Sequence, residues 1–150
     1  MPLLRAALSW NFVLATAICA SLLAQLIKVL LNLFIFHRFI AERMWGAGGM
    51  PSSHSATVCA MVVATGRYCG VNSPLFAIAA VLSIIVMYDA MGVRYETGEQ
   101  AKVLNRMFTE WMDQGFEQFQ LPHGKKLKEM VGHTPIEVVT GAALGIVLGF

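Results

Sequence analysis

Residues 48–58 read GGMPSSHSATV, and they place the most polar cluster of the chain directly before an apolar run. The two glycines permit backbone conformations that turn amide groups into a concavity. The proline suits a first helical turn, and Ser52 or Ser53 can cap the free amides of a helix that begins there. Because free N–H groups and the positive end of a helix dipole favour anions, the stretch predicts a phosphate-binding helix start.

The rest of the chain has the composition of an integral membrane protein. Its 150 residues are 57% hydrophobic and 13% charged, with a mean hydropathy of +0.62. The first apolar segment exceeds the roughly 30 Å hydrocarbon core and must tilt or protrude, whereas the other three are short, so helices of a soluble core are the alternative. We expect an all-α membrane bundle in one domain, residues 1–150, with about four spans: Leu8–Phe36, His54–Tyr68, Pro74–Tyr88 and Pro135–Phe150.

Four spans place the loops 37–53 and 90–134 on one side of the membrane, with both termini and the turn 70–73 on the other. Most of the eleven Lys and Arg residues lie on the side of the two loops, which by the positive-inside rule faces the cytoplasm of a bacterial-type plasma membrane. Loops that bind an anion would also be basic, so the two explanations overlap. Eight of the eleven lie on this side, and they are Arg38, Arg43, Arg94, Lys102, Arg106, Lys125, Lys126 and Lys128.

The long loop 90–134 contains a helical pattern of its own. Between Glu99 and Phe119, apolar residues recur at helical spacing and charged residues occupy the other faces. An amphipathic helix lying at the membrane interface is one interpretation, and a helix packed on the bundle as a lid or brace is the other.

His54 stands at the predicted helix start, where a bound phosphate would favour its protonated form. It could then donate a proton to a leaving-group oxygen as a general acid. The alternative is an ordinary capped helix with an interfacial histidine.

A second polar cluster, Gly132-His133-Thr134-Pro135-Ile136-Glu137, precedes the last apolar segment. Thr134 with Glu137 three residues on is a capping-box pattern, which accounts for the carboxylate without any chemistry. His133 is harder to explain in that way. One of its ring nitrogens could be held by Glu137 while the other attacks phosphorus as a nucleophile.

These motifs, with Tyr88-Asp89-Ala-Met-Gly92-Val-Arg94 between them, resemble the divergent branch of the type 2 phosphatidic acid phosphatase (PAP2) superfamily, which is related to vanadium-dependent haloperoxidases. The resemblance covers roughly residues 28–149. It implies a helical membrane bundle that hydrolyses a lipid phosphate without metal or other cofactor, with His133 as nucleophile, Glu137 as its orienting carboxylate and His54 as general acid.

Basic residues and amides would hold the phosphate. The usual Lys-x6-Arg-Pro motif of the superfamily is absent, since the residue seven after Lys28 is an isoleucine. Lys28 either faces the phosphate or snorkels to the interface. Arg94 is the best substitute for the missing arginine, and Asp89 is expected to pair with it. The phosphate-binding set is thus Lys28, Gly49, Ser52, Ser53 and Arg94, with Asp89 in support.

Glycines at 141, 145 and 149 allow close helix approach, within the bundle or in a homodimer. The leading hypothesis is a membrane phosphohydrolase acting on a lipid phosphate or pyrophosphate through a phosphohistidine. The alternative is a non-catalytic protein that binds or translocates lipid phosphates. A purely structural membrane protein explains neither histidine. Membrane lipid and a lipid-phosphate substrate are the expected partners, and nucleic acid is not.

Overall fold

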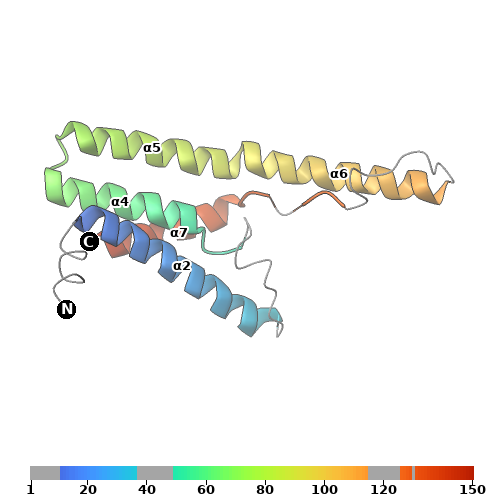
Figure 1. Ribbon diagram of the computed structural model, residues 1–150, viewed down its shortest axis with the longest axis horizontal. Helices are drawn as coiled ribbons and strands as arrows, with labels where there is room; N and C mark the ends of the chain where they lie inside the picture. Colours follow the sequence, from blue (N-terminus) through green and yellow to red (C-terminus); the bar gives the residue numbers. More distant parts are fainter. Residues whose placement is uncertain (1–10, 37–48, 115–125, 130) are drawn as a thin grey trace.

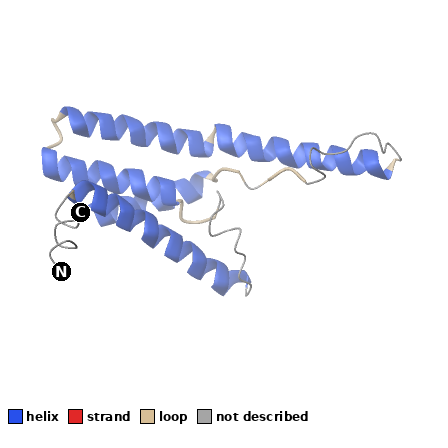
Figure 2. Ribbon diagram, viewed as in Figure 1, coloured by secondary structure: helices blue, strands red, loops and turns tan. Residues whose placement is uncertain are grey.

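The computed structural model describes residues 11–36, 49–114, 126–129 and 131–150, and within them helices are the only regular secondary structure (Figures 1 and 2). This confirms the predicted all-α class. Residues 8–10 of the first predicted span and residues 115–119 of the amphipathic pattern lie outside the described residues. The helices are α2 (Phe12–Phe36), α4 (Ser53–Cys69), α5 (Pro74–Met91), α6 (Val93–Asp113) and α7 (Pro135–Gly149).

Side-chain caps set the helix starts. Asn11 Oδ1 accepts a hydrogen bond of 3.0 Å from the Leu14 amide at the start of α2, and Ser73 Oγ accepts one of 3.2 Å from Phe76 at the start of α5. Ser52 is the cap of α4. The proline of the GGMPSSHSATV stretch therefore precedes the cap instead of occupying the first turn, and that expectation was wrong. Prolines begin α5 and α7.

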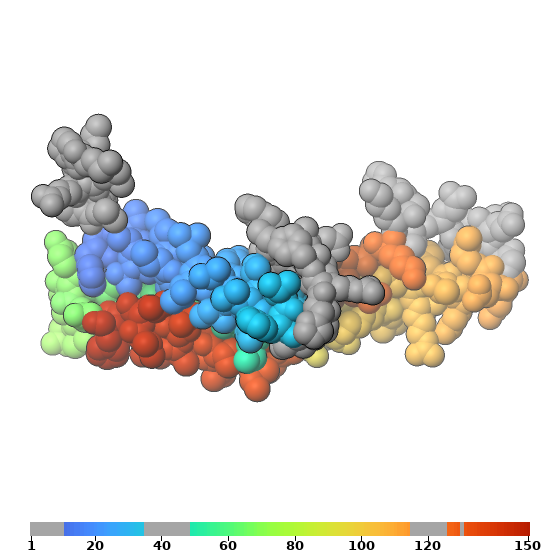
Figure 3. Space-filling model, turned by 90° about the horizontal axis from the view of Figure 1, so that it is seen from below, coloured from blue at the N-terminus to red at the C-terminus, as the bar shows by residue number. Residues whose placement is uncertain are grey.

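Helix α4 is the centre of the bundle and packs against α2, α5 and α7. Four alanines, Ala20 and Ala24 of α2 with Ala56 and Ala60 of α4, form a fully buried core. A methyl group at Gly141 would lie only 2.3 Å from the backbone oxygen of Ser52. The glycines of α7 thus bring it against α4 within one chain. Figure 3 shows α2 in blue beside α7 in red on one face of the bundle.

Helices α4 and α7 run parallel, and both begin at the end of the bundle where α2 and α5 finish (Figure 1). The turn between α4 and α5, the start of α2 and the end of α7 lie at the opposite end. Because of this arrangement, the two histidine motifs and the motif of Asp89 and Arg94 meet at one end of the bundle.

Helix α6 corrects the expected shape of the loop 90–134. It begins at Val93 instead of near Glu99 and continues away from the bundle in the direction of α5 (Figure 1). The reason is that Gly92 keeps the backbone hydrogen bonds of both helices. Its N–H donates to the Tyr88 oxygen of α5 at 2.8 Å, and its oxygen accepts from the Glu96 amide of α6 at 3.0 Å. Among the described helices only α5 contacts α6, so α6 does not pack along the other helices of the bundle.

The segment that returns from α6 to α7 is fastened along α6. Asn105 donates to the Leu127 oxygen at 2.9 Å and accepts from the Leu127 amide at 2.8 Å, so one side chain replaces a pair of backbone bonds. Gly98 makes room for this segment, since a methyl group there would lie 2.5 Å from the Glu129 oxygen. Helix α6 therefore guides the chain back to the start of α7.

Two helical stretches, Phe12–Phe34 and Pro74–Asp113, are long and apolar enough to cross a membrane, each with a mean hydropathy of 2.1 in its most apolar window. Much of their apolar surface is uncovered: Ile78 and Ile84 of α5 are 64% and 62% exposed. In a soluble protein such surface would be buried, whereas a membrane helix turns it to lipid.

Candidate functional site

The first turn of α4 is joined to the first turn of α7. The Ser52 amide donates to the Glu137 backbone oxygen at 2.9 Å. Ser52 Oγ accepts from the hydroxyl of Ser55 at 3.0 Å and from its amide at 3.4 Å. Both serines are fully buried. The sequence analysis did not single out Ser55, although a serine three residues after the cap is the signal for such a contact.

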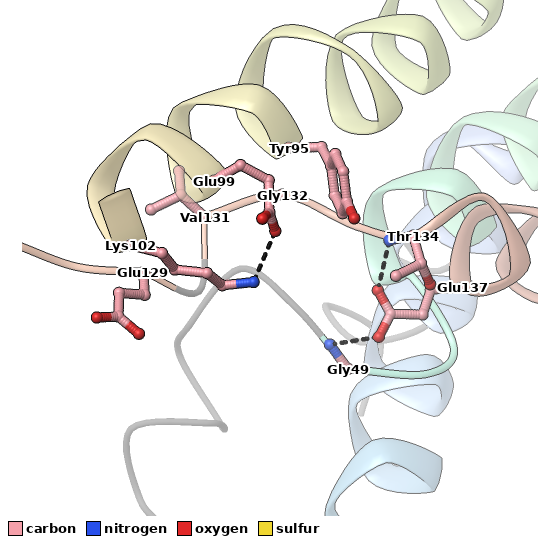
Figure 4. Close-up of a pocket in the computed structure, with 9 residues that line it drawn as sticks. All are labelled: Gly49, Tyr95, Glu99, Lys102, Glu129, Val131, Gly132, Thr134 and Glu137. Carbon is pink, nitrogen blue, oxygen red and sulfur yellow. Dashed lines mark hydrogen bonds and ion pairs between the residues drawn. The ribbon is translucent and has the colours of Figure 1, made fainter. Parts of the chain in front are cut away.

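Glu137 binds two loops together with one carboxylate. Its Oε1 accepts from the Gly49 amide at 3.1 Å and its Oε2 from the Thr134 amide at 2.9 Å (Figure 4). The second bond is the capping interaction that the Thr-x-x-Glu pattern predicted. Gly49 has a φ of 87°, which favours glycine, and its amide is directed to Glu137. No hydrogen bond between Glu137 and His133 is present among the described residues.

The two histidines meet at this end of the bundle. His54 stands exposed on the first turn of α4, while His133, just before α7, is only 2% exposed. Their ring centroids are 6.2 Å apart with the planes at 79°, an edge-to-face arrangement. Residues 79 positions apart in sequence are therefore neighbours because α4 and α7 begin side by side.

The backbone on either side of His133 is held closely. The His133 amide donates to the oxygen of Ala90, near the end of α5, at 3.0 Å. Gly132 has a φ of 122°, and a methyl group there would lie 2.4 Å from the Tyr95 amide nitrogen. Only glycine allows the chain to pass this close to α6. Neither Gly132 nor Ala90 was assigned this positioning role from the sequence.

The side chain of His133 has the properties of a neutral nucleophile. Its Nε2 is buried and has no hydrogen-bond partner. Burial lowers the pKa of the His133 imidazole below its ordinary value; the charge of Glu137 opposes this shift, and the positive charges of Lys28 and Arg94 add to it. A neutral imidazole with an unpartnered ring nitrogen can attack an electrophile.

Lys28 lies at the same end, on the face of α2 that packs on α4. It follows Ala17, Ala20 and Ala24 on that face and is 4% exposed. Its side-chain carbons pass under Gly49, where Cδ would be 3.4 Å from an added methyl group. This burial counts against the snorkelling alternative. No ion pair of Lys28 is present in the described part of the chain.

Asp89 and Arg94 form the pair that the sequence suggested. Arg94 Nε donates to Asp89 Oδ2 at 2.6 Å, with both side chains about half exposed. This bond uses the inner nitrogen of the guanidinium and leaves its two terminal nitrogens as donors. The backbone of Arg94 lies against Gly132, the residue before His133, which places Arg94 beside the histidines.

Backbone donors complete the positive environment. The amides of Ser53 and His54 are in the first turn of α4, where no acceptor inside the helix is available. The start of α7 adds a second helix dipole with its positive pole at the same end. Lys28, Arg94 and two helix starts therefore converge on the two histidines, an arrangement that favours an anion.

A separate cavity of about 140 Å³ lies next to Glu137 (Figure 4). Gly49, Thr134 and Glu137 form one wall, and Tyr95 with the ion pair of Lys102 and Glu99, 2.6 Å long, forms another. Neither histidine lines it. Among the described residues no group of three His, Cys, Asp or Glu side chains is placed to hold a metal ion.

Comparison with known proteins identifies the family of the chain. The model of the divergent PAP2 family matches residues 9–148. A protein named as the uncharacterized membrane protein YuiD of Bacillus subtilis is 39% identical over 144 residues, which cover 92% of this chain and 91% of that protein. No solved structure matches significantly. The two histidine motifs thus lie within a match that extends over nearly the whole chain, and the chain belongs to the divergent PAP2 family.

Proposed function

We propose that the protein is an integral membrane phosphohydrolase that removes phosphate from a lipid phosphate or pyrophosphate through a phosphohistidine on His133. The observation that carries the proposal is the unpartnered, buried Nε2 of His133, with His54 at a ring distance of 6.2 Å. Membership of a PAP2-related family supports the same chemistry.

In the first half of the reaction His133 Nε2 attacks phosphorus, and the bond from phosphorus to the lipid oxygen breaks. His54 protonates that oxygen as it leaves. Lys28, the terminal nitrogens of Arg94 and the amides of Ser53 and His54 stabilise the charge on the other phosphate oxygens. The lipid alcohol, or the lipid monophosphate from a pyrophosphate, is the first product.

In the second half, water attacks the phosphohistidine. His54, now neutral, accepts a proton from that water, and the bond from phosphorus to His133 breaks to release inorganic phosphate. Glu137 contributes by holding the loop of Gly49 against the start of α7, and its negative charge favours the positive charge that develops on His133.

We further propose that α2, α4, α5 and α7 all cross the membrane, with the site on the cytoplasmic side. The 17 residues of α4 and 15 residues of α7 are about 26 and 23 Å long, slightly less than the hydrocarbon core. Their polar starts would then reach the headgroup region, where a lipid phosphate lies. Helix α6 would project into the cytoplasm beyond α5.

A second candidate function is binding or translocation of lipid phosphates without hydrolysis. It is favoured by one observation: Arg94 is half exposed and shares its charge with Asp89, so the transferred phosphoryl group would have fewer cationic contacts than a fully buried arginine provides.

The deciding experiment incubates purified protein with ³²P-labelled lipid phosphates and pyrophosphates in the presence of chelator. Wild-type protein is expected to release phosphate and to carry an acid-labile, alkali-stable label when quenched. His133→Ala should lose both the release and the label, whereas Thr140→Ala, on the first turns of α7, should keep them. Retained binding of the lipid with neither release nor label would establish the non-catalytic function instead.

A further inference from the structure

A long apolar groove lies over α4 between α2 and α5. Both of these helices contact α4, but within the described residues they do not contact each other, so one face of α4 is left uncovered. Figure 1 shows α4 between them. The cavity along this face has a volume of about 560 Å³, and its lining is largely aliphatic and aromatic, with Phe12, Ile78 and Leu82 among the wall residues.

The floor of the groove lies on the same face of α4 as His54. Met61, Thr65 and Tyr68 of α4 line the groove, and they follow His54 by 7, 11 and 14 residues. This spacing puts all four side chains on one face of the helix. At about 1.5 Å per residue, the groove begins about 10 Å from His54 and ends about 21 Å from it.

From this alignment we infer that the groove holds the hydrocarbon chain of the substrate, and that the substrate is a phosphate or pyrophosphate ester of one long alkyl or isoprenoid chain. The inference rests on the proposed function. A phosphate bound beside His54 would direct its chain along the only uncovered face of α4 within the described bundle, where the lining is apolar.

The length of the groove favours a long chain. One leaflet of the hydrocarbon core is about 15 Å deep, so a chain that reaches Tyr68 passes the bilayer midplane. The volume lies within the ordinary range for small-molecule sites, and a groove over one helix has room for a chain lying along that helix. A glycerolipid has two chains and would place one of them outside the groove.

The test uses a non-hydrolysable long-chain alkyl phosphonate that carries a diazirine near the end of the chain, bound to the full-length protein in lipid vesicles. After irradiation, the labelled peptides are identified by mass spectrometry. Label is expected on the second half of α4 and the first half of α5, around Thr65 and Ile78. Equal labelling of lipid-facing positions such as Val139 would overturn the inference.

A matched pair of variants on α5 sharpens the test. Leu82, 45% exposed, lines the groove, whereas Ile85, 58% exposed, does not. Leu82→Trp should reduce groove labelling at least fivefold and raise KM for a long-chain phosphate but not for a short-chain one, and Ile85→Trp should change neither. Unchanged labelling in Leu82→Trp contradicts the inference, as does a change in oligomeric state, which would make the groove a contact between copies.

The two proposals fail separately. Because the phosphonate cannot be hydrolysed, groove labelling without any phosphate release from lipid esters would refute catalysis while retaining the chain site for a binding protein. Release of phosphate with no preference for chain length and no groove labelling would refute the chain site alone.

Discussion

The two ends of the bundle differ in whether a positive side chain has a partner within the protein. At the end where α4 and α7 begin, Lys28 is buried without an ion pair in the described chain, and helix dipoles add further positive charge. At the other end Arg67 donates to the backbone oxygens of Gly149 and Phe150 and lies over the ring of Phe12. Arg67 is therefore neutralised by the negative end of α7, whereas Lys28 has no ion-pair partner in the described chain and is available to an anion from outside the protein.

The strongest test of this difference exchanges one cation at each end for methionine. Lys28→Met should weaken inhibition by orthovanadate, a phosphate mimic, about 10- to 100-fold, since a charged hydrogen bond contributes about 1.5–3 kcal/mol. Its unfolding temperature should not fall, because a buried unpaired cation is removed. Arg67→Met should lose about 1 kcal/mol of stability and keep its vanadate affinity. Equal loss of affinity in both variants would contradict the comparison.

Glu137→Gln should destabilise the site end by about 1–3 kcal/mol. An amide side chain offers one oxygen, so either the Gly49 or the Thr134 N–H would face an NH₂ group and lose its acceptor. Thermal unfolding in detergent measures the effect. Glu110→Gln is the control, because its partner Arg106 is exposed and a surface pair contributes little. A thermal unfolding midpoint for Glu137→Gln equal to that of Glu110→Gln would show that the two hydrogen bonds of Glu137 do not stabilise the site end.

Alanine substitutions at Gly141 and Gly149 of α7 distinguish an effect on helix packing from an effect on catalysis. An added methyl group would lie 2.3 Å from the Ser52 oxygen at Gly141 and 2.5 Å from Val63 Cβ at Gly149. Alanine at either position should cost about 1–3 kcal/mol through overpacking. Only Gly141→Ala should also lower kcat, by about tenfold or more, because it displaces the two histidines relative to each other. Equal kcat in both variants would mean that the helix starts need no fixed spacing.

The pH dependence of kcat/KM should report His133 as a neutral nucleophile. Burial lowers its pKa, so the imidazole stays neutral as the pH falls below the ordinary histidine value of about 6.5, and the rate should decline only at a lower pH. Since Glu137 opposes the shift, Glu137→Gln should move this acidic limb further down. An acidic limb above 6.5 would show that a different group, or a charged His133, controls the step.

The smallest effect is expected for Asp89→Asn. The pair with Arg94 is about half exposed, so its loss should change stability by no more than about 0.5 kcal/mol. Freed from Asp89, Arg94 should be less well oriented, and KM should rise a few-fold with kcat nearly unchanged. A large fall in stability would instead identify the pair as structural.

Much of the fold could be predicted from local signals. Apolar runs bounded by Ser52, Ser73 and Thr134 gave the positions of three helices to within a few residues, because caps and prolines act on the first turn alone. The capping bond of Glu137 and the pairing of Asp89 with Arg94 also follow from spacings of three and five residues. The roles of the histidines in catalysis remain predictions.

Long-range contacts could not be predicted in the same way. The clamp from Glu137 to Gly49 joins residues 88 positions apart, and Asn105 holds Leu127 across 22 positions. Nor could spacing show that Gly92 would let α6 continue from α5, since a glycine usually weakens a helix. In each case a tertiary contact or a completed backbone bond decides the outcome.

The parallel arrangement of α4 and α7 has a consequence for turnover. Of the two neighbouring helix starts, only α7 has a carboxylate in its first turn, Glu137, so the positive pole of α4 is the one left for an added anion. Under the proposed function inorganic phosphate would bind this pole as the lipid phosphate does, so the product should stabilise the fold, by about 2.7 kcal/mol at a concentration 100 times its Kd. If the proposed function holds, the protein is subject to product inhibition, and its steady-state rate depends on how readily the surrounding water removes phosphate.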